Sequence, residues 1–287
     1  MENILEVNDL SKEYKDFRLD HITFSVPRGM ICGMIGENGA GKTTTISCIM
    51  DILRPDSGDV RVFGMDYAHA AREIKERIGL VMDGLEQNPF LYVSDLDKIM
   101  KRLYRTWDSG RFQSYLKRFQ LPADKKVKDL SKGMNVKLNF AIALSHDVEL
   151  LILDEATSGL DPVMRDEILD LLQEFVTDEN HSILISSHIT SDLDKIADYI
   201  LFIHEGKISF LKSREDIELN YGVLHCRREL FEALSPEDYD AYIQEPYSYK
   251  VLINNRSEVE RRFQDLLVDR ATIEDIMLFY VKGVVTC

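Results

Sequence analysis

The sequence predicts an α/β protein built around a mixed, mainly parallel sheet. Apolar runs of strand length lie at 30–35, 149–153 and 182–186, and a helical pattern occupies 162–175 between the last two. A strand, a helix and a second strand in this order imply parallel strands joined by a right-handed crossover. Runs this short and this apolar are typical of strands buried on both faces of a sheet.

Three further parts are expected around this sheet. Strand patterns at 4–7 and 24–26 predict an N-terminal antiparallel β subdomain. A long, nearly strand-free helical stretch predicts an inserted helical subdomain at about 84–147. We therefore expect one large domain over 1–212 and a small C-terminal α+β accessory domain over 213–287, where the regular strand–helix order ends. In the latter, strand patterns lie at 221–226 and 249–253 and helical patterns at 257–267 and 272–280, and Thr272 and Asp275 have the spacing of a capping box.

The composition predicts a globular protein of the cytosol. With 287 residues, 45% of them apolar, the chain can bury a sizeable core. It has no apolar run near the roughly 18 residues that a membrane-spanning helix requires, and its first residues lack the pattern of a signal peptide. A formal charge of −15 argues against nucleic acid as the main partner, because phosphate backbones bind clustered Lys and Arg. Cys32, Cys48, Cys226 and Cys287 lack the paired spacing of a metal site and are expected to be reduced.

One glycine-rich segment carries the strongest chemical signal. Residues 36–44 are Gly-Glu-Asn-Gly-Ala-Gly-Lys-Thr-Thr, which matches G-x-x-x-x-G-K-[ST] between a strand pattern and a helical pattern. Such a loop curls its backbone N–H groups around phosphates, and the helix N-terminus adds a positive dipole. A glycine turn with a chance lysine is the alternative, and the flanking strand and helix argue against it.

Each part of this loop has an expected role. Lys42 should reach the β- and γ-phosphates, the Thr43 hydroxyl should ligate Mg²⁺, and Thr44 should contact the α-phosphate side. The predicted nucleotide-binding set in this loop is Gly36, Asn38, Gly39, Ala40, Gly41, Lys42, Thr43 and Thr44.

A pair of carboxylates follows the buried strand pattern at 149–153. Asp154 should lie at the end of that strand, beside the glycine-rich loop, where it can hold Mg²⁺ directly or through water. Glu155, one step further, should face the γ-phosphate and accept a proton from the attacking water. An acidic pair after a strand is weak evidence alone, because carboxylates often cap helices. Combined with a P-loop in the same sheet, it predicts a P-loop NTPase.

Further motifs narrow the family. The segment 130–134, Leu-Ser-Lys-Gly-Met, resembles the Leu-Ser-Gly-Gly-Gln signature of ATP-binding cassette (ABC) proteins. Ser-Gly-Leu-Asp at 158–161 looks like the D-loop of that family, and Ser-Ser-His at 186–188 looks like its switch histidine. Tyr14 sits where the family places an aromatic residue that stacks on adenine. The motifs occur in the family order, and the resemblance covers roughly 4–212.

The resemblance implies roles for residues distant from the P-loop. Two cassettes of this family pair head to tail, so Ser131 and Gly133 should contact the ATP that is held by the other cassette. Asp161 should act as a contact across the dimer, as the N-cap of the following helix, or as both. His188 should contact the γ-phosphate, whereas a satisfied histidine at a strand end is the alternative. For Tyr14 an ordinary surface aromatic is the alternative, and its position relative to the other motifs favours the adenine contact.

The sequence departs from the family pattern at several positions. Lys132 replaces the first glycine of the signature, Met134 replaces its glutamine, and Ala156 replaces a usual proline. Asp83 occupies the place of a glutamine that touches Mg²⁺ and senses the membrane partner. A carboxylate can still ligate Mg²⁺, although it reaches one methylene less far. Gln87 is the alternative if the loop is longer, and the motif spacing favours Asp83.

The resemblance implies that the chain is the ATP-binding and ATP-hydrolysing subunit of an ABC transporter. Because the chain has no pore of its own, it should dock onto a separately encoded membrane-spanning subunit through the helical subdomain and the loop around Asp83. That would place it in the cytoplasm, at the inner face of the cell membrane. The signature, the tract at 154–162 and the segment at 273–277 look similar to bacterial exporter ATPases for peptides, antibiotics or lipid-like cargo.

Several alternatives stay open on the sequence. A soluble, non-transport ABC ATPase, for example one for iron–sulfur assembly, is the main alternative function. An ATP-gated clamp with little turnover is a third hypothesis, and the intact Glu155 argues against it. The dimer could be a homodimer or a heterodimer with a paralogue. The basic stretch at 98–118 could face lipid headgroups, but a solvated helix face is the preferred interpretation.

Overall fold

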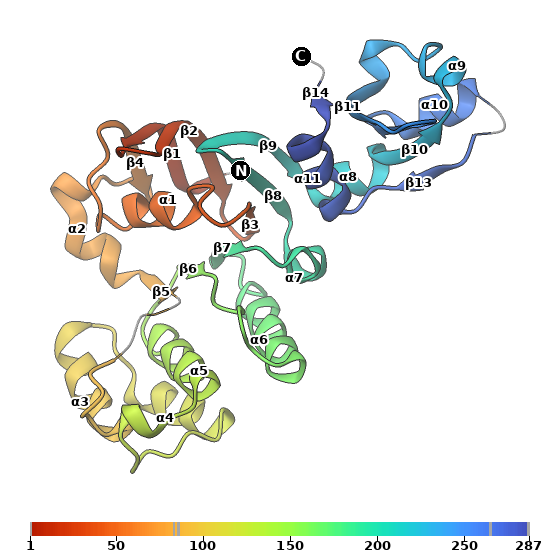
Figure 1. Ribbon diagram of the computed structural model, residues 1–287. Helices are drawn as coiled ribbons and strands as arrows, with labels where there is room; N and C mark the ends of the chain where they lie inside the picture. The colour runs from red at the N-terminus through yellow and green to blue at the C-terminus, as the bar shows by residue number, and fades with distance from the viewer. Residues whose placement is uncertain (1, 83, 85–86, 264–265, 286–287) are drawn as a thin grey trace.

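A computed structural model describes residues 2–82, 84, 87–263 and 266–285. A six-stranded sheet forms its centre, and Figure 1 shows the other parts arranged around it. In spatial order the strands are β5 (Ile78–Met82), β6 (Leu150–Asp154), β7 (Ser182–Ser187), β3 (Ile31–Ile35), β8 (Tyr199–His204) and β9 (Lys207–Ser213). Strands β5 to β8 are parallel and β9 is antiparallel to β8, so the predicted mixed parallel sheet is confirmed.

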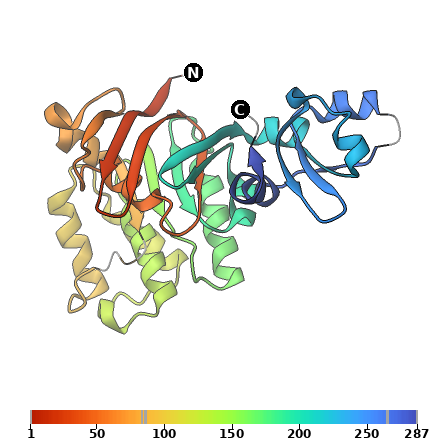
Figure 2. The same cartoon turned by 45° about the horizontal axis from the view of Figure 1, so that its top comes forward.

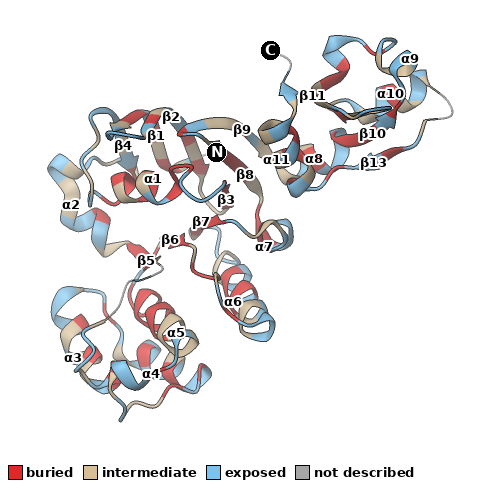
Figure 3. Ribbon diagram, in the orientation of Figure 1, coloured by how far each residue is buried: buried red, intermediate tan, exposed pale blue. Residues whose placement is uncertain are grey.

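The central strands are apolar because both faces of the sheet are covered. All five residues of β3 and of β6 are buried. One face packs against the N-terminal part of the chain and against helix α1 (Lys42–Ile49), whereas the other packs against the helical elements (Figure 3). Because the parallel strands all end at one edge, the loops that follow β3, β6 and β7 meet there.

The N-terminal segment forms the predicted antiparallel sheet. Its strands β1 (Asn3–Glu13), β2 (Arg18–Pro27) and β4 (Ser57–Val62) pair in the order β2-β1-β4. Alternate residues of β2, among them Ile22, Phe24 and Val26, are buried against the central sheet, and the residues between them are more exposed. The connection from β4 to β5 carries helix α2 (Tyr67–Glu76).

The region predicted to be helical contains α3 (Val93–Leu103), α4 (Ser109–Arg118), the short η1 (Val127–Asp129) and α5 (Lys132–Ala143). These helices form a separate lobe beside the ends of β5 and β6 (Figures 1 and 2). Asp108 caps α4 through bonds from two backbone N–H groups. Trp107 is buried in this lobe, and its indole N–H donates to Asp97 at 2.8 Å. The basic residues of 98–118 are all exposed, as a solvated helix face requires.

Two helices complete the core, and a second small sheet follows. Helix α6 (Pro162–Phe175) connects β6 to β7, and α7 (Thr190–Ile196) connects β7 to β8. The C-terminal sheet has the order β13-β10-β12-β11-β14, and all of its pairs are antiparallel. Its elements are α8 (Arg214–Asn220), β10 (Gly222–Cys226), α9 (Arg228–Phe231), η2 (Pro236–Asp238), β11 (Tyr239–Gln244), β12 (Tyr249–Ile253), α10 (Arg256–Arg262), β13 (Val268–Arg270), α11 (Ile273–Lys282) and β14 (Val284–Val285).

Helix α11 attaches this C-terminal domain to the central sheet. The capping box predicted at its start is present, since Thr272 and Asp275 each accept the backbone N–H of the other. Ile276 and Phe279 are buried in the same apolar core as β8 and β9. The ring of Tyr280 lies 5.3 Å from that of Phe210 on β9. In the described part of the chain, no helix is long and apolar enough to cross a membrane.

Candidate nucleotide-binding site

The glycine-rich loop connects the end of β3 to the start of α1, as the sequence predicts. A side chain at Gly36 would collide with the carbonyl oxygen of Ile203 on β8, so the loop passes too close to that strand for any other residue. Gly41 is the N-cap of α1 and has a φ of 115°, which strongly favours glycine. The loop therefore brings its N–H groups and the N-terminus of α1 to one place.

A hollow of about 470 Å³ opens over this loop. It is lined by Asp16, Phe17, Glu37, Asn38, Gly39, Gly41, Lys42, Thr43, Thr44 and Glu155. Gly36 and Ala40 are buried behind it. The loop residues predicted from the motif, together with Glu155, thus surround a cavity of a size suited to a nucleotide.

Lys42 is held inside this hollow. Its side chain is only 5% exposed, and its ammonium group donates to the carbonyl oxygen of Gly36 at 2.7 Å. The same nitrogen lies 3.2 Å from the Oε1 atom of Glu155. The P-loop lysine and the proposed general base therefore meet across the cavity.

The two carboxylates after β6 are positioned by β7. The Ser186 hydroxyl donates to Asp154 Oδ1 at 2.6 Å, and Asp154 is buried. The backbone N–H of Glu155 bonds to the carbonyl oxygen of Ser186 at 3.2 Å and to its hydroxyl at 3.1 Å. Ser186 had no predicted role of its own, because its bonds to the acidic pair depend on the pairing of β6 with β7.

Glu155 occupies an unusual backbone conformation. Its φ is 52°, in the left-handed region of backbone conformations. This region costs a non-glycine residue free energy, and residues that adopt it are often found at functional sites. Its Oε2 atom lies 2.6 Å from Nδ1 of His188, which follows β7. The carboxylate thus lies between the P-loop lysine on one side and the predicted switch histidine on the other. Such a position suits a group that orients water and takes a proton.

The aromatic residue at the cavity is Phe17. Tyr14, which was predicted to stack on adenine, is 45% exposed, and its ring centroid lies 6.3 Å from that of Phe17. Phe17 itself lines the hollow. Both aromatics precede the P-loop in the sequence, so the sequence alone allows either to contact the adenine. Only the conformation of the turn between β1 and β2 places Phe17 at the cavity.

The signature residues lie outside this cavity, at the start of α5. Ser131 caps the helix by accepting the N–H of Met134 at 3.2 Å. A β-carbon at Gly133 would come within 2.5 Å of Met164 Cε, so the flexible end of the Met164 side chain packs directly over this glycine. The side chain of Lys132 extends toward the D-loop. Its Nζ atom lies 3.1 Å from the position that a β-carbon at Gly159 would occupy.

Asp161 has the structural role that was expected for it. Its Oδ1 atom accepts the N–H of Met164 at 3.1 Å and so caps α6. Met164, in the first turn of α6, is the residue that covers Gly133 of the signature. The D-loop and the signature of one chain are therefore packed together as one surface.

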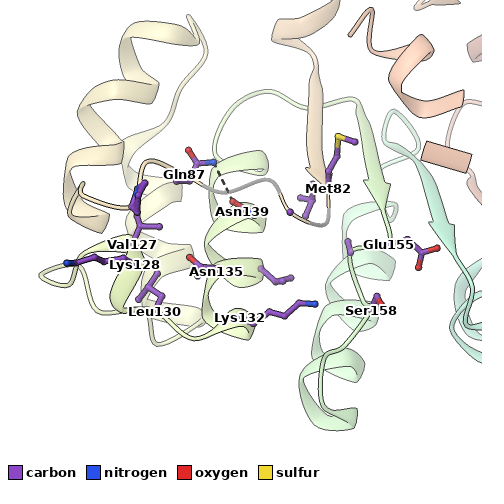
Figure 4. A pocket seen from close by; sticks show the side chains of 15 residues that line it. Met82, Gln87, Val127, Lys128, Leu130, Lys132, Asn135, Asn139, Glu155 and Ser158 are labelled. Atoms are coloured by element: carbon purple, nitrogen blue, oxygen red, sulfur yellow. Dashed lines mark hydrogen bonds between the residues drawn. The ribbon is translucent and has the colours of Figure 1, made fainter. Parts of the chain in front are cut away.

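Asp83, the predicted substitute for the sensing glutamine, lies outside the described residues. The alternative, Gln87, directs its amide toward Asn139 on α5 at 3.5 Å (Figure 4). Gln87 and Asn139 line a second hollow of about 500 Å³ between the helical lobe and the loop after β6, which Glu155 and Ser158 also border. Gln87 therefore lies at a hollow that the helical lobe shares with the predicted catalytic carboxylate.

The predicted Mg²⁺ ligands fit a hard cation. Thr43 places a hydroxyl in the first turn of α1, and Asp154 places a buried carboxylate at the end of β6. Oxygen donors of this kind suit Mg²⁺, which needs only one or two protein ligands beside substrate phosphates. The described residues contain no cluster of three or more His, Cys, Asp or Glu side chains that could hold a metal without such phosphates.

The fold and this site define a P-loop ATPase, and comparisons with known proteins give the family. The family model described as "ABC transporter" matches residues 19–158. The chain is 36% identical over 213 residues to the bacitracin transport ATP-binding protein BcrA of Bacillus licheniformis, covering 72% of this chain and 69% of that protein. It is 32% identical over 231 residues to the lantibiotic transport ATP-binding protein SrtF of Streptococcus pyogenes, covering 80% and 99%.

A solved structure supports the same assignment. The ATP-binding subunit of an ABC transporter matches with a TM-score of 0.67 at 26% identity, covering 75% of this chain and 92% of that one. The chain belongs to the ATP-binding proteins of ABC transporters. It is an ATPase subunit, related to ATP-binding proteins for bacitracin and lantibiotic transport. The soluble, non-transport alternative is thereby disfavoured.

Proposed function

We propose that this chain hydrolyses MgATP to power export of an amphiphilic peptide or antibiotic through a separate membrane-spanning subunit. The observation that carries the chemistry is the position of Glu155, which borders the P-loop cavity between Lys42 on one side and His188 on the other. The cargo class rests on the relatives, which are named for bacitracin and lantibiotic transport.

The chain's own groups would share the chemistry as follows. Lys42 and the N-terminus of α1 bind the β- and γ-phosphates of ATP. Glu155 accepts the proton of the attacking water, and His188 holds that carboxylate in place and faces the developing charge. When bound, Mg²⁺ supplies charge neutralisation at the phosphates, held by Thr43 and Asp154.

A second cassette would complete each site. Ser131 and Gly133 lie outside the P-loop cavity of their own chain, yet they sit at the N-terminus of a helix, which attracts anions. In a head-to-tail pair, this helix end covers the γ-phosphate that is bound by the other chain, and Asp161 makes a contact across the pair. A twofold homodimer gives two complete sites, and pairing with a paralogue would retain the same arrangement.

The helical lobe and the loop around residue 83 would form the docking surface for the membrane-spanning subunit. Phe90 and Tyr92 expose 69% and 45% of their surface beside the hollow lined by Gln87. Lys128 and Lys126 lie over the rings of Phe90 and Tyr92, at 5.8 and 5.5 Å. Exposed aromatics of this kind favour a protein partner. Docking here holds the chain at the inner face of the cell membrane.

Purification of the tagged chain from its native cell in mild detergent tests this proposal. We expect a multi-spanning membrane protein at near-equal amount, and we expect Phe90→Asp to reduce its recovery while the ATPase activity of the free chain stays unchanged. Tyr247→Asp, at a 94% exposed position of the C-terminal domain, is the matched control. Recovery of soluble partners alone, in a preparation where other membrane complexes survive, would contradict the transporter function.

A further inference from the structure

A hollow of about 470 Å³ lies between the loop that carries His188 and helix α11 of the C-terminal domain. Its polar lining consists of Glu37 of the P-loop, His188, Thr190, and Glu274 and Lys282 of α11. Its apolar side is formed by Ile189 and by Met277, Leu278 and Val281 of α11. The C-terminal domain therefore borders the γ-phosphate end of the nucleotide site, although it follows the cassette in sequence.

Helix α11 has more apolar surface than its own chain covers. Ile276 and Phe279 are buried in the core and already provide the apolar face that a surface helix needs. Leu278, on the side of the hollow, remains 40% exposed. Met277 and Val281, which line the same hollow, are also only partly buried. Apolar side chains grouped in this way beside a hollow are typical of a surface that another segment covers.

The location of the hollow indicates what covers it. Glu37 and His188 lie on the face of the nucleotide site that a second copy would cover in the proposed dimer, and Asp161 of that copy would approach the same face. Val163, two positions after Asp161 in the first turn of α6, exposes 79% of its surface. An apolar residue this exposed, beside a predicted dimer contact, matches the apolar side of the hollow in chemistry and in place.

We propose that the first turn of α6 of a second copy inserts Val163 into the hollow between His188 and α11. This inference rests on the proposed head-to-tail dimer and gives the C-terminal domain a part in it. By twofold symmetry the contact is made twice, because each chain donates one Val163 and receives one. The C-terminal domain then adds apolar area to the dimer at the place where the γ-phosphate acts, so loss of that phosphate would release this contact as well.

ATP-dependent dimerisation of the Glu155→Gln chain, measured by sedimentation velocity, tests the inference. We expect Leu278→Asp and Val163→Asp in this background each to raise the dissociation constant of the dimer at least about tenfold, because an unpaired charge would be buried in an apolar contact. Binding of ATP to each monomer should be unchanged. Leu219→Asp, at a 60% exposed position of α8 in the same domain, is the matched control and should dimerise like the parent.

Disulfide formation tests the contact without relying on charged variants. The described cysteines Cys32, Cys48 and Cys226 are buried, so Cys287→Ser provides the background. In an equal mixture of Val163→Cys and Leu278→Cys chains with different tags, MgATP should promote a cross-link between the two, and ADP should not.

The outcomes separate the two proposals. A parent dimer that forms normally, is unaffected by Leu278→Asp and gives no cross-link would overturn the contact and leave the dimer standing. A parent chain that stays monomeric with MgATP would overturn both.

Discussion

Glu155 lies between the two other residues of the proposed hydrolytic site. It is bordered by Lys42 at 3.2 Å and by His188 at 2.6 Å, and its backbone is held to Ser186 of the neighbouring strand. A carboxylate at this position can take a proton from water, whereas an amide cannot. We predict that Glu155→Gln binds ATP but hydrolyses it about 10²- to 10⁴-fold more slowly, as loss of a general base requires. Turnover near the wild-type rate in a purified, folded variant would refute the assignment.

Ser186 is a positioning residue that the sequence did not reveal. Its hydroxyl holds the Asp154 carboxylate at 2.6 Å, and partners of a metal ligand typically affect metal affinity by about 10- to 100-fold. We predict that Ser186→Ala raises the Mg²⁺ concentration needed for half-maximal ATPase activity by at least about tenfold. A Mg²⁺ titration at saturating ATP measures this shift.

The control for this prediction lies on the same strand. Ser182 is equally buried at the other end of β7, where its hydroxyl accepts the N–H of Gly29 at 2.9 Å, far from the acidic pair. Ser182→Ala should leave the Mg²⁺ requirement unchanged. Equal shifts in both variants would mean that the strand is disturbed in general, and that Ser186 does not act through Asp154.

Among single residues, the sequence predicted those whose role depends on their spacing within a short motif. The P-loop glycines, Lys42 and the acidic pair lie within short motifs, so their positions relative to a strand and a helix follow from the sequence itself. Phe17 at the cavity and Met164 over Gly133 depend on how distant segments pack. Periodicity and motif spacing carry no information about such contacts.

At the scale of elements, the junction between α5 and the central sheet contains a buried histidine. His146 follows α5, its ring stacks 4.1 Å from that of Tyr104, and Nε2 lies 3.1 Å from the carbonyl oxygen of Ile78 on β5. Burial lowers the pKa of His146 below the ordinary histidine value, despite the neighbouring Asp147. The folded protein therefore prefers the neutral ring, and the unfolded chain binds the proton more readily.

This shift predicts a pH dependence of stability. His146 contributes to the free energy of unfolding. This contribution is complete above the pKa of histidine in the unfolded chain, about 6.5, and decreases as the pH drops below that value. We predict that His146→Gln, which can keep the bond to Ile78, loses less stability between neutral pH and mildly acidic pH than the wild type. Urea unfolding across this range measures the difference. An identical slope for His146→Gln and the wild type would contradict the prediction.

Strands and helices with a clear apolar pattern were predicted from the sequence, whereas several elements of the C-terminal domain were not. The central strands and α6 fall within a residue or two of their expected limits, because continuous apolar runs of strand length and a capping Asp define them. In the C-terminal domain, β11, β13 and β14 were missed, and α10 ends at Arg262 although a helix over 257–267 was expected. β13 and β14 have only three and two residues and are held by pairing with their neighbours, so they leave little pattern in the sequence. β11 has six residues, and its burial depends on the strands beside it in the sheet.

At the scale of the whole molecule, the C-terminal domain is attached to the cassette more closely than the change in sequence pattern at residue 212 suggests. Its helix α11 shares a core with β8 and β9 and borders the loop that carries His188 (Figure 1). The sequence identified this helix and its capping box, but not the surface that it covers. The long-range position of an element depends on tertiary packing, which local patterns do not determine.

The central claim is that each active site combines the P-loop of one chain with the signature of another. It predicts that Lys42→Ala and Ser131→Arg are each inactive alone, the first because phosphate binding is lost and the second because the site in the partner chain is blocked. Ser131→Arg should still bind nucleotide as a monomer.

The most direct measurement is the ATPase activity of an equal mixture of these two inactive variants. In a mixed dimer, the intact P-loop of the Ser131→Arg chain meets the intact signature of the Lys42→Ala chain. Random pairing makes half of the dimers mixed, each with one of two sites complete, so about a quarter of the wild-type activity should return. If the mixture stays inactive while mixed dimers form, or if Ser131→Arg alone is fully active, the shared active site is wrong.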